Sequence, residues 1–321
     1  MDVLTDVLES IHVKSVVFGR LELTAPWGLS MPGGHAGFYV VTRGACCLQV
    51  EGVDEPLQLA GGDFVVLAKG QPHVIKDRES STALPVAEVL GKCASRKGCQ
   101  PGGIFRHGAG GGGPLTTLIG GCFRFEDGAK NPLVSALPAV VHVTSDYGTP
   151  VQWLEASLQF VASEMAAGQP GAETVVGRLA DILLVQAVRA HLAQSGEAAR
   201  GWLRGLVDPQ IGEALALIHE KPEEPWTVES LAARVAMSRS AFAARFAQLV
   251  EEPPLTYLTR WRMHKATRLL RASHAGLGEI ARRVGYEAEA AFNKAFKRWM
   301  GTTPGAYRRQ PSAAPLSAPT G

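Results

Sequence analysis

The stretch that decides the fold runs from Trp226 to Arg309 and contains one pattern written twice. The first copy reads Thr227-VESLAARVAMSRSAFAARFAQLVEEPPLTY and ends at Tyr257. The second reads Leu277-GEIARRVGYEAEAAFNKAFKRWMGTTPGAY and ends at Tyr307. Aromatic, apolar and proline positions in the second half of each copy recur at one spacing. The first halves match at an offset one residue smaller, so the second copy carries an additional residue between its two helices.

Each copy predicts a helix, a tight turn and a second helix. In the first helix of copy one, Val228, Leu231 and Val235 lie at helical spacing. Ser238 is a suitable N-cap for the helix that follows, and Gly285 suits the positive φ of a sharp helix exit. Each second helix is expected to bury one stripe of side chains: Phe242, Phe246 and Leu249 in copy one, and Phe292, Phe296 and Trp299 in copy two.

Repeat number and charge bear on whether this region is a plain helical bundle or a short solenoid. A solenoid needs about three or more repeats, and here there are two. Between Leu203 and Gln310 the chain carries 17 Lys and Arg against 11 Asp and Glu, whereas the remaining residues have an acidic excess. A basic excess in the repeats is what phosphate binding requires. The pattern therefore favours two helix-turn-helix units that place their second helices in the DNA major groove.

The second copy with its extension, Ile280-ARRVGYEAEAAFNKAFKRWMGTTPGAYRR, closely resembles the C-terminal signature of AraC/XylS-type transcription regulators. The resemblance implies two helix-turn-helix units joined by a long helix from Leu255 to Ala272. It further implies a cytoplasmic regulator, not an enzyme, that binds promoter DNA and works with RNA polymerase. An activator is expected, although the sequence does not distinguish activation from repression. Two other classes stay open: a cupin-type enzyme fused to a DNA-binding module, and a constitutive DNA-binding protein.

The residues expected to read DNA are carried over from this resemblance by position. They lie on the sides of the two second helices that face away from the phenylalanines. Ala244 stands where many relatives have Arg, so the first helix offers little hydrogen-bonded readout beyond Arg239 and Ser240. Asn293 can pair with adenine and Lys294 with guanine. The full set is Arg239, Ser240, Ala243, Ala244, Glu289, Ala290, Asn293 and Lys294.

Further cations lie on the joining helix and after it. We expect them to contact phosphates or to form a solvated face. They are Arg260, Arg262, Lys265, Arg268, Arg271, Lys297, Arg298, Arg308 and Arg309.

The amino-terminal half predicts strands instead of helices. Short apolar runs such as Phe38-YVV, Cys46-CLQV and Phe64-VVLA alternate with glycines between Ser15 and Val143. Closely spaced short strands indicate a small barrel or jelly roll. Gly62-DFVVLAKGQPHVI resembles the second motif of cupin barrels, and the wider region resembles the cupin-like sensor half of some AraC-type regulators. The expected fold class is α+β with several domains: a cupin-like barrel, a helical segment, and an all-helical double helix-turn-helix domain.

The barrel holds the candidate residues for sensing a small molecule. A cupin metal site uses a pair of histidines, a Glu and a later His. His73 corresponds to the later His, but the paired-His region reads Gly37-Phe-Tyr39-Val with only His35 nearby. Because a first-row metal needs about three or more protein ligands, no cofactor is expected. An organic effector near Tyr39 and His73 is the alternative, and His107 is a further candidate in a Gly-rich loop.

All five cysteines, at positions 46, 47, 93, 99 and 122, belong to the amino-terminal half. Cys93 and Cys99 flank a basic pentapeptide, and adjacent positive charge favours the reactive thiolate. We therefore consider redox or metal sensing by Cys93 and Cys99, with an unreactive loop as the alternative. Cys46 and Cys47 occupy consecutive strand positions and should point to opposite faces.

The expected organisation has four parts. Residues 1–148 form the sensor domain, 149–200 a helical segment and linker, 201–310 the DNA-binding domain, and 311–321 a Pro-rich tail. The family resemblance implies a homodimer through 149–195, with packing against the barrel of the same chain as the alternative. The chain contains no apolar run near the ~20 residues of a membrane span, and its acidic start lacks a signal-peptide pattern.

Overall fold

A computed structural model describes residues 3–10, 13–89, 104–108, 112–125, 131–144, 169–195 and 201–309, with 156–157, 160–161, 163–164 and 167. The chain divides into two compact units. The helical unit comprises Met1–His12, Asn131–Ala136 and Ser195–Pro315, and the sheet unit comprises Val13–Lys130, Leu137–Gln194 and Leu316–Gly321. This division differs from the predicted boundaries at 148 and 200, because two segments of the amino-terminal half fold with the carboxy-terminal helices.

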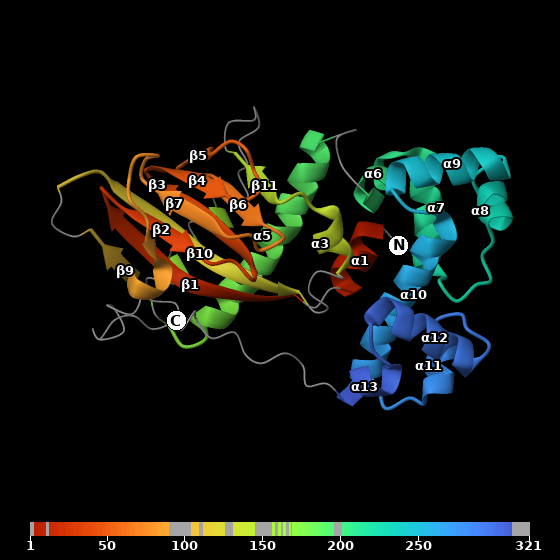
Figure 1. Ribbon diagram of the computed structural model, residues 1–321. Helices are drawn as coiled ribbons and strands as arrows, with labels where there is room; N and C mark the ends of the chain where they lie inside the picture. Colours follow the sequence, from red (N-terminus) through yellow and green to blue (C-terminus); the bar gives the residue numbers. More distant parts are fainter. Residues whose placement is uncertain are drawn as a thin grey trace. The chain divides into compact units, whose positions relative to one another are not determined.

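The sheet unit contains two facing sheets and one long helix, α5 (Ala172–Ser195) (Figure 1). One sheet has the strand order β11-β6-β3-β10-β1-β9 and the other β5-β4-β7-β2-β8. Their pairs are antiparallel except β1 with β9 and β2 with β8, which are parallel. The strands are β1 (Val13–Thr24), β2 (Gly28–Met31), β3 (Ala36–Arg43), β4 (Ala45–Val50), β5 (Leu57–Ala60), β6 (Phe64–Leu67), β7 (His73–Lys76), β8 (Leu84–Pro85), β9 (Ile104–His107), β10 (Leu115–Phe125) and β11 (Val140–Val143).

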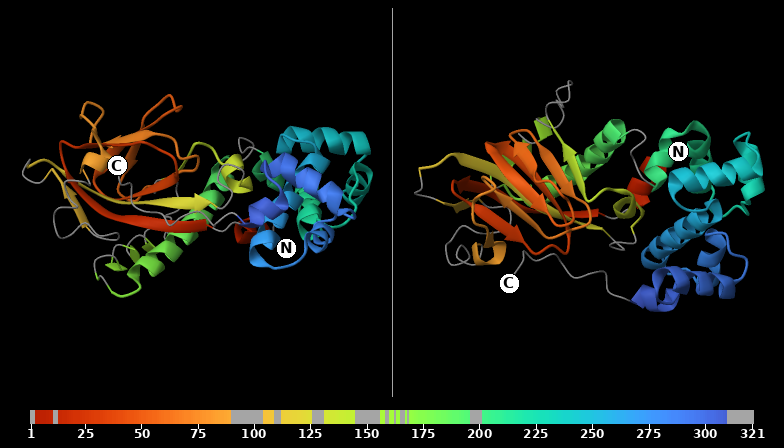
Figure 2. Two further views of the ribbon diagram at one scale, coloured as in Figure 1. Left: turned by 60° about the horizontal axis from the view of Figure 1, so that its bottom comes forward. Right: turned by 45° about the horizontal axis from the view of Figure 1, so that its top comes forward.

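Both faces of the six-stranded sheet are buried. Alternate residues of a strand point to opposite faces, and in β3 Tyr39 and Val41 enter the core between the sheets. Phe38 lies on the opposite face, with its ring centroid 4.8 Å from that of Phe123 and 6.1 Å from that of Phe64. The helix α5 runs along this sheet (Figure 2) and buries its own apolar residues, including Leu183 and Leu184. The two-sheet arrangement confirms the predicted small barrel.

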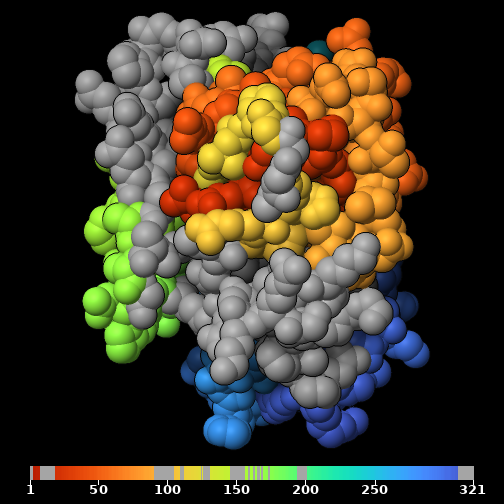
Figure 3. All heavy atoms as spheres, turned by 90° about the vertical axis from the view of Figure 1, so that its left-hand side faces the viewer, coloured from red at the N-terminus to blue at the C-terminus, as the bar shows by residue number. Residues whose placement is uncertain are grey.

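The early strands (red and orange) and the segment of β9 and β10 (yellow) adjoin at the surface of this barrel (Figure 3). Between the sheets, the core is filled by apolar side chains from both. Leu29, Leu48 and Ile75 come from the smaller sheet, and Leu67 and Leu118 from the larger one. The strand register therefore fixes which residues of the barrel face its interior.

The helical unit contains both copies of the repeated pattern. The first helix-turn-helix consists of α8 (Val228–Arg234) and α9 (Arg239–Val250), and the second of α11 (Leu277–Arg283) and α12 (Glu289–Met300). The helix α10 (Pro254–Ala272) joins the two units and begins one residue earlier than predicted. The remaining helices of this unit are α1 (Val3–Ser10), α3 (Pro132–Ala136), α6 (Gly201–Val207), α7 (Pro209–Glu220) and α13 (Pro304–Arg309).

The two turns are equivalent, with one difference in length. The Met237 N–H donates to the carbonyl of Ala232, and the Tyr286 N–H donates to that of Ala281. Ser238 caps α9, whereas α12 begins one residue later relative to its turn, as the additional residue of the second copy predicts. Each turn also has a left-handed residue in the same place, Ala236 with φ 53° and Gly285 with φ 81°.

The predicted phenylalanine stripes are buried. Phe242, Phe246, Phe292 and Phe296 are each 0% exposed. Leu249 and Trp299, however, are only partly buried. In α9 it is Val250, not the predicted Leu249, that continues the buried face.

The helix α1 packs inside the helical unit through apolar and polar contacts. Val3 and Val7 are buried. Asp6 lies 3.0 Å from Nδ1 of His219 on α7, and Nε2 of His219 lies 2.7 Å from the Tyr257 hydroxyl. Burial lowers the pKa of His219 below its ordinary value. A neutral imidazole satisfies both neighbours when Nδ1–H donates to Asp6 and Nε2 accepts from Tyr257.

We predict that Ala236→Gly raises the free energy of unfolding of the helical unit. Ala236 is exposed and adopts φ 53°, and an L-residue in this region costs roughly 1–2 kcal/mol. Greater freedom of Gly in the unfolded chain offsets part of that gain, so about 0.5 kcal/mol should remain. Urea unfolding followed by far-UV circular dichroism measures the change. The control is Ala233→Gly, exposed within α8, which should lower the stability by about 1 kcal/mol. Equal effects of the two substitutions would contradict the assignment of strain to position 236.

Candidate DNA-binding interface

The recognition residues predicted on α9 lie on its outer side. Arg239, Ser240 and Ala244 are exposed, and Ala243 is half-buried. Nε of Arg239 is 2.7 Å from Oε1 of Glu229 on α8, and both side chains are mostly exposed. A cation at the first position of a helix opposes the helix dipole, and Glu229 offsets that charge. The pair also holds Arg239 at the amino-terminal end of α9, the part of a recognition helix that contacts base edges.

The second recognition helix, α12, is richer in charge. Glu289, Ala290 and Lys294 are exposed. Asn293 is half-buried, and its Oδ1 is buried without a hydrogen-bond partner among the described residues. Bidentate pairing with adenine uses both amide atoms. Asn293 must therefore rotate its amide to pair in this way, which the sequence did not indicate.

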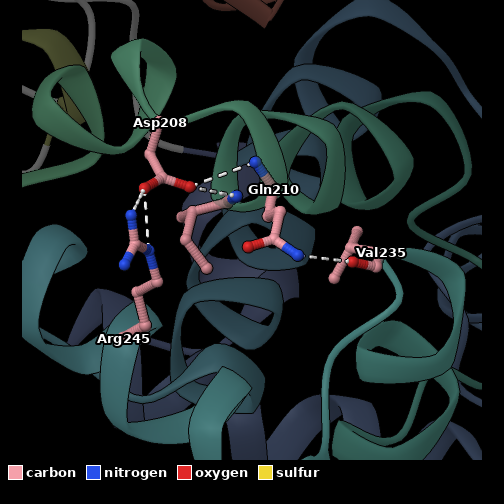
Figure 4. Close-up of polar contacts among 5 residues, drawn as sticks. Asp208, Gln210, Val235 and Arg245 are labelled. Atoms are coloured by element: carbon pink, nitrogen blue, oxygen red, sulfur yellow. Dashed lines mark hydrogen bonds and ion pairs between the residues drawn. The ribbon is translucent and has the colours of Figure 1, made fainter.

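A polar network holds α9 against the helices that precede it (Figure 4). Oδ1 of Asp208 accepts the backbone N–H groups of Gln210 and Ile211 and so caps α7. Its Oδ2 accepts Nε–H of Arg245 on α9 at 2.8 Å, and Nη2 of Arg245 also contacts it. The Gln210 side chain donates to the carbonyl of Val235 at the end of α8. The network thus links α7 to both helices of the first helix-turn-helix.

The Asp208 carboxyl is held in its charged form by these contacts. Burial alone would raise its pKa, but the hydrogen bonds from Ile211 and Arg245 and the charge of Arg245 outweigh burial and lower it. Neither Asp208 nor Arg245 belonged to the predicted site. The sequence Asp208-Pro209 before an apolar run is an N-cap signal, but nothing local indicates that Arg245, far along the chain, is its partner.

Several cations predicted as phosphate contacts have partners inside the protein instead. Arg260 pairs with Glu252 at 2.5 Å, and its guanidinium lies over the Tyr257 ring. Arg262 donates to two backbone carbonyls, and Lys265 donates to the carbonyl of His219. Arg308 likewise donates to the carbonyls of Leu270 and Ala275. Arg260 and Arg262 therefore have partners within the protein, and the phosphate contacts expected of them stay a prediction.

Other predicted cations remain on the surface. Lys294, Lys297 and Arg298 are exposed on α12. They are suited to phosphates because a Lys or Arg that neutralises a phosphate displaces bound counterions. The charge available to DNA is therefore concentrated on the second helix-turn-helix.

The structure places the predicted sensor residues in different environments. The Tyr39 hydroxyl is 2.8 Å from Nε2 of His73, and Nδ1 of His73 is 2.9 Å from the carbonyl of Gln71. Burial lowers the pKa of His73 and raises that of Tyr39. His35 is exposed. His107 lies on β9, at the edge of the larger sheet and three strands from β3, so Tyr39 and His73 are brought together without it.

The described cysteines are buried. Cys46 and Cys47 are each 1% exposed and Cys122 is 4% exposed. Burial raises the pKa of Cys46 to about 12 and also raises that of Cys47, which disfavours the reactive thiolate. Cys93 and Cys99 lie outside the described residues. Among the residues that the structure describes, no three His, Cys, Asp or Glu side chains are grouped to hold a metal ion.

Comparison with known proteins agrees with this arrangement. The sequence matches the family described as Cupin over residues 2–193 and the family described as Helix-turn-helix domain over residues 231–310. A putative AraC-like transcription regulator of Streptomyces lividans is 37% identical over 97% of this chain and 99% of its own length. The transcriptional regulator AlkR of Acinetobacter baylyi is 32% identical over 97% of this chain and all of its own. The RCS-specific transcriptional activator RclR of Escherichia coli is 30% identical over 61% of this chain and 68% of its own.

The chain combines a cupin-like barrel with a double helix-turn-helix unit, and its relatives match it over nearly its full length. Together these two observations define the class of protein. The chain belongs to the AraC family of transcription regulators. It is a DNA-binding transcription regulator. No helix within the described ranges is both long enough and apolar enough to cross a membrane.

We predict that Asp208→Asn lowers the free energy of unfolding of the helical unit at pH 7 by about 1 kcal/mol, because Asn still caps α7 but loses the charged bond to Arg245. The folded pKa of Asp208 is depressed, so its stabilisation is present above the ordinary carboxyl pKa and is lost as the pH falls through the folded value. The difference between the two proteins should therefore shrink as the pH falls below about 4.

Urea unfolding at several pH values, followed by far-UV circular dichroism, measures this difference. The matched variant Asp208→Ala removes the cap as well and should cost about 1 kcal/mol more. A stability difference between wild type and Asp208→Asn that stays constant down to pH 3 would rule out the charged pair as the cause.

Proposed function

We propose that the protein is a signal-gated transcription regulator that binds two half-boxes of promoter DNA and activates the neighbouring genes. The observation that carries the gating is the position of α1 and α3. Both come from the amino-terminal half of the chain, and both fold into the helical unit that contains the recognition helices. The sensor sequence and the DNA-binding fold are therefore joined at more than one point of the chain.

Short connections make this arrangement suited to transmitting a signal. The helix α1 ends at Ser10 and β1 begins at Val13, while α3 ends at Ala136 and β11 begins at Val140. Trp202 of α6 donates its indole N–H to the carbonyl of Pro132 and so anchors the start of α3. A signal that shifts β1 or β11 would act directly on helices packed in the DNA-binding unit. Gating requires that the signal interact differently with the active and inactive states.

The signal is an oxidant or a small organic molecule. Burial argues against Cys46, Cys47 and Cys122 as the reactive thiols, and raised pKa values argue further against the first two. This leaves Cys93 and Cys99. Lys92, Arg96 and Lys97 stand close to them in the sequence and favour their thiolates. The name of RclR describes an RCS-specific transcriptional activator, which supports activation. If the thiols do not respond, the Tyr39 and His73 region of the barrel is the place for an organic effector.

We further propose that the regulator is a cytoplasmic homodimer that works with RNA polymerase and requires no metal. The dimer would form through residues 149–195. Val175 and Ile182 on α5 are 37% and 50% exposed. They are seven residues apart and therefore lie on one side of the helix, opposite its buried residues. Exposed apolar side chains in one stripe support pairing with a second copy.

Selection of genomic DNA fragments on the purified protein, with and without mild oxidant, tests this function. Retention of a few promoter fragments that carry two half-boxes about one helical turn apart is the expected result. Binding that is indifferent to sequence and to the signal would instead identify a constitutive DNA-binding protein. Turnover of a substrate with bound Fe, Zn or Mn would identify the cupin-type enzyme.

We predict that replacing both Cys93 and Cys99 by Ser abolishes the effect of oxidant on DNA binding and leaves binding without oxidant within about twofold of wild type, since neither thiol lies in the recognition helices. Fluorescence anisotropy with a selected promoter fragment measures both quantities. The control is Cys122→Ser, which removes a buried thiol. An unchanged oxidant response in the double variant would exclude the thiol switch and direct the search to saturable ligands of the barrel.

A further inference from the structure

Arg262 contacts the segment that leads into the first helix-turn-helix unit and the turn of the second unit. It projects from α10, the helix that joins them. Its Nε donates to the carbonyl of Pro222 at 2.6 Å, and its Nη2 donates to the carbonyl of Glu224 at 2.8 Å. Both carbonyls belong to the segment 221–226, which leads directly to Thr227, the N-cap of α8. One guanidinium therefore fixes the entry to the first unit.

The same guanidinium meets the turn of the second unit. Its Cζ lies 5.7 Å from the centroid of the Tyr286 ring. A Cβ added to Gly285 would lie 2.6 Å from Nη2 of Arg262 and 2.8 Å from the carbonyl oxygen of Glu223. Only Gly fits at position 285, because the turn at 285–286 packs closely against Arg262 and the segment 221–226. In the first copy, an exposed residue, Ala236, stands at the corresponding place.

The chemistry of this contact is specific to Arg. Its planar fork presents donors in fixed directions, so one side chain can bind two carbonyls while its face packs on a ring. Lys keeps the charge but offers a single compact ammonium. Because the bond from Arg262 to the Pro222 carbonyl is partly buried, its loss leaves that carbonyl without its donor, which is costly.

We propose that Arg262 is a positioning residue for DNA recognition, which sets the separation and relative orientation of α9 and α12 by tying the segment 221–226 to the turn at 285–286. Two recognition helices held at a fixed separation bind two half-boxes as one bivalent ligand, and the gain depends on how well their spacing matches the DNA. Arg262 therefore determines which half-box spacing the regulator accepts. This role rests on the proposed binding of two half-boxes.

The test compares wild type, Arg262→Lys and Arg262→Gln on three DNAs: the selected two-box fragment, the same fragment with one base pair inserted between the boxes, and a fragment with a single box. Wild type should prefer the original spacing. Arg262→Lys should bind the original fragment roughly tenfold more weakly and discriminate the inserted fragment less. Its affinity for single-box DNA should stay within about twofold, and the slope of affinity against salt should not change, because no phosphate contact is lost.

The matched control is Lys297→Gln, which removes an exposed cation of α12. It should weaken binding to all three DNAs alike and reduce the salt slope by about 1. If Arg262→Lys behaves like this control, or keeps the spacing preference of wild type, Arg262 is not a positioning residue. Arg262→Lys keeps the charge and Arg262→Gln removes it, so the two variants distinguish the role of charge from that of the fixed hydrogen-bond geometry. Loss of the spacing preference in both variants supports the proposal. Loss in Arg262→Gln but not in Arg262→Lys overturns it.

A measurement without DNA separates failure of this inference from failure of the proposed function. Amide hydrogen exchange should become faster within 221–227 and 284–288 in Arg262→Lys, and stay unchanged in α7 (Pro209–Glu220). Unchanged exchange in both segments would overturn the contact that the proposal requires. If wild type itself shows no preference for two-box DNA, the proposed function fails, and accelerated exchange would then leave Arg262 as a structural link that does not act in recognition.

Discussion

The central constraint on the helical unit is that neither helix-turn-helix can bury its apolar face alone. The helices α8 and α11 contain seven residues each, too few to be stable in isolation. Each unit is completed by a tyrosine of the helix that follows its recognition helix. Tyr257 of α10 packs edge-on against Phe246, and Tyr307 of α13 packs against Phe296. Since Met263 and Leu270 of α10 also enter the core of the second unit, α10 supports both recognition helices at once.

Packing on one shared helix changes what the basic residues do. A cation on α10 lies near carbonyls and acidic groups of the packed unit, so several arginines have partners within the protein. Arg260 and Arg262 are satisfied by internal partners, and Arg245 by Asp208. Cations exposed on α12 have no such environment. The net basic charge of the domain therefore includes cations whose contacts hold its helices together.

The amino-terminal half contributes more than a sensor barrel. Burial of Val3 and Val7 and the contact of Asp6 with His219 make α1 part of the helical unit. The apolar residues at positions 3, 4 and 7 lie at helical spacing, which is typical of a helix with one buried face. The pattern did not show which surface the helix covers, because an apolar stripe records that a face is buried and not the partner that buries it.

The sequence by itself determined the local structure: the two helix-turn-helix repeats, their caps, the additional residue in the second turn, and the strands of the barrel. These features depend on spacing, capping and backbone conformation, which act between near neighbours. Only the tertiary structure decided that Asp208 holds Arg245, that Asp6 meets His219, and that Arg262 joins the segment 221–226 to the turn of the second unit. Such pairs join residues up to 213 positions apart. Their formation depends on how whole elements pack, and no local pattern of residue types encodes that distance.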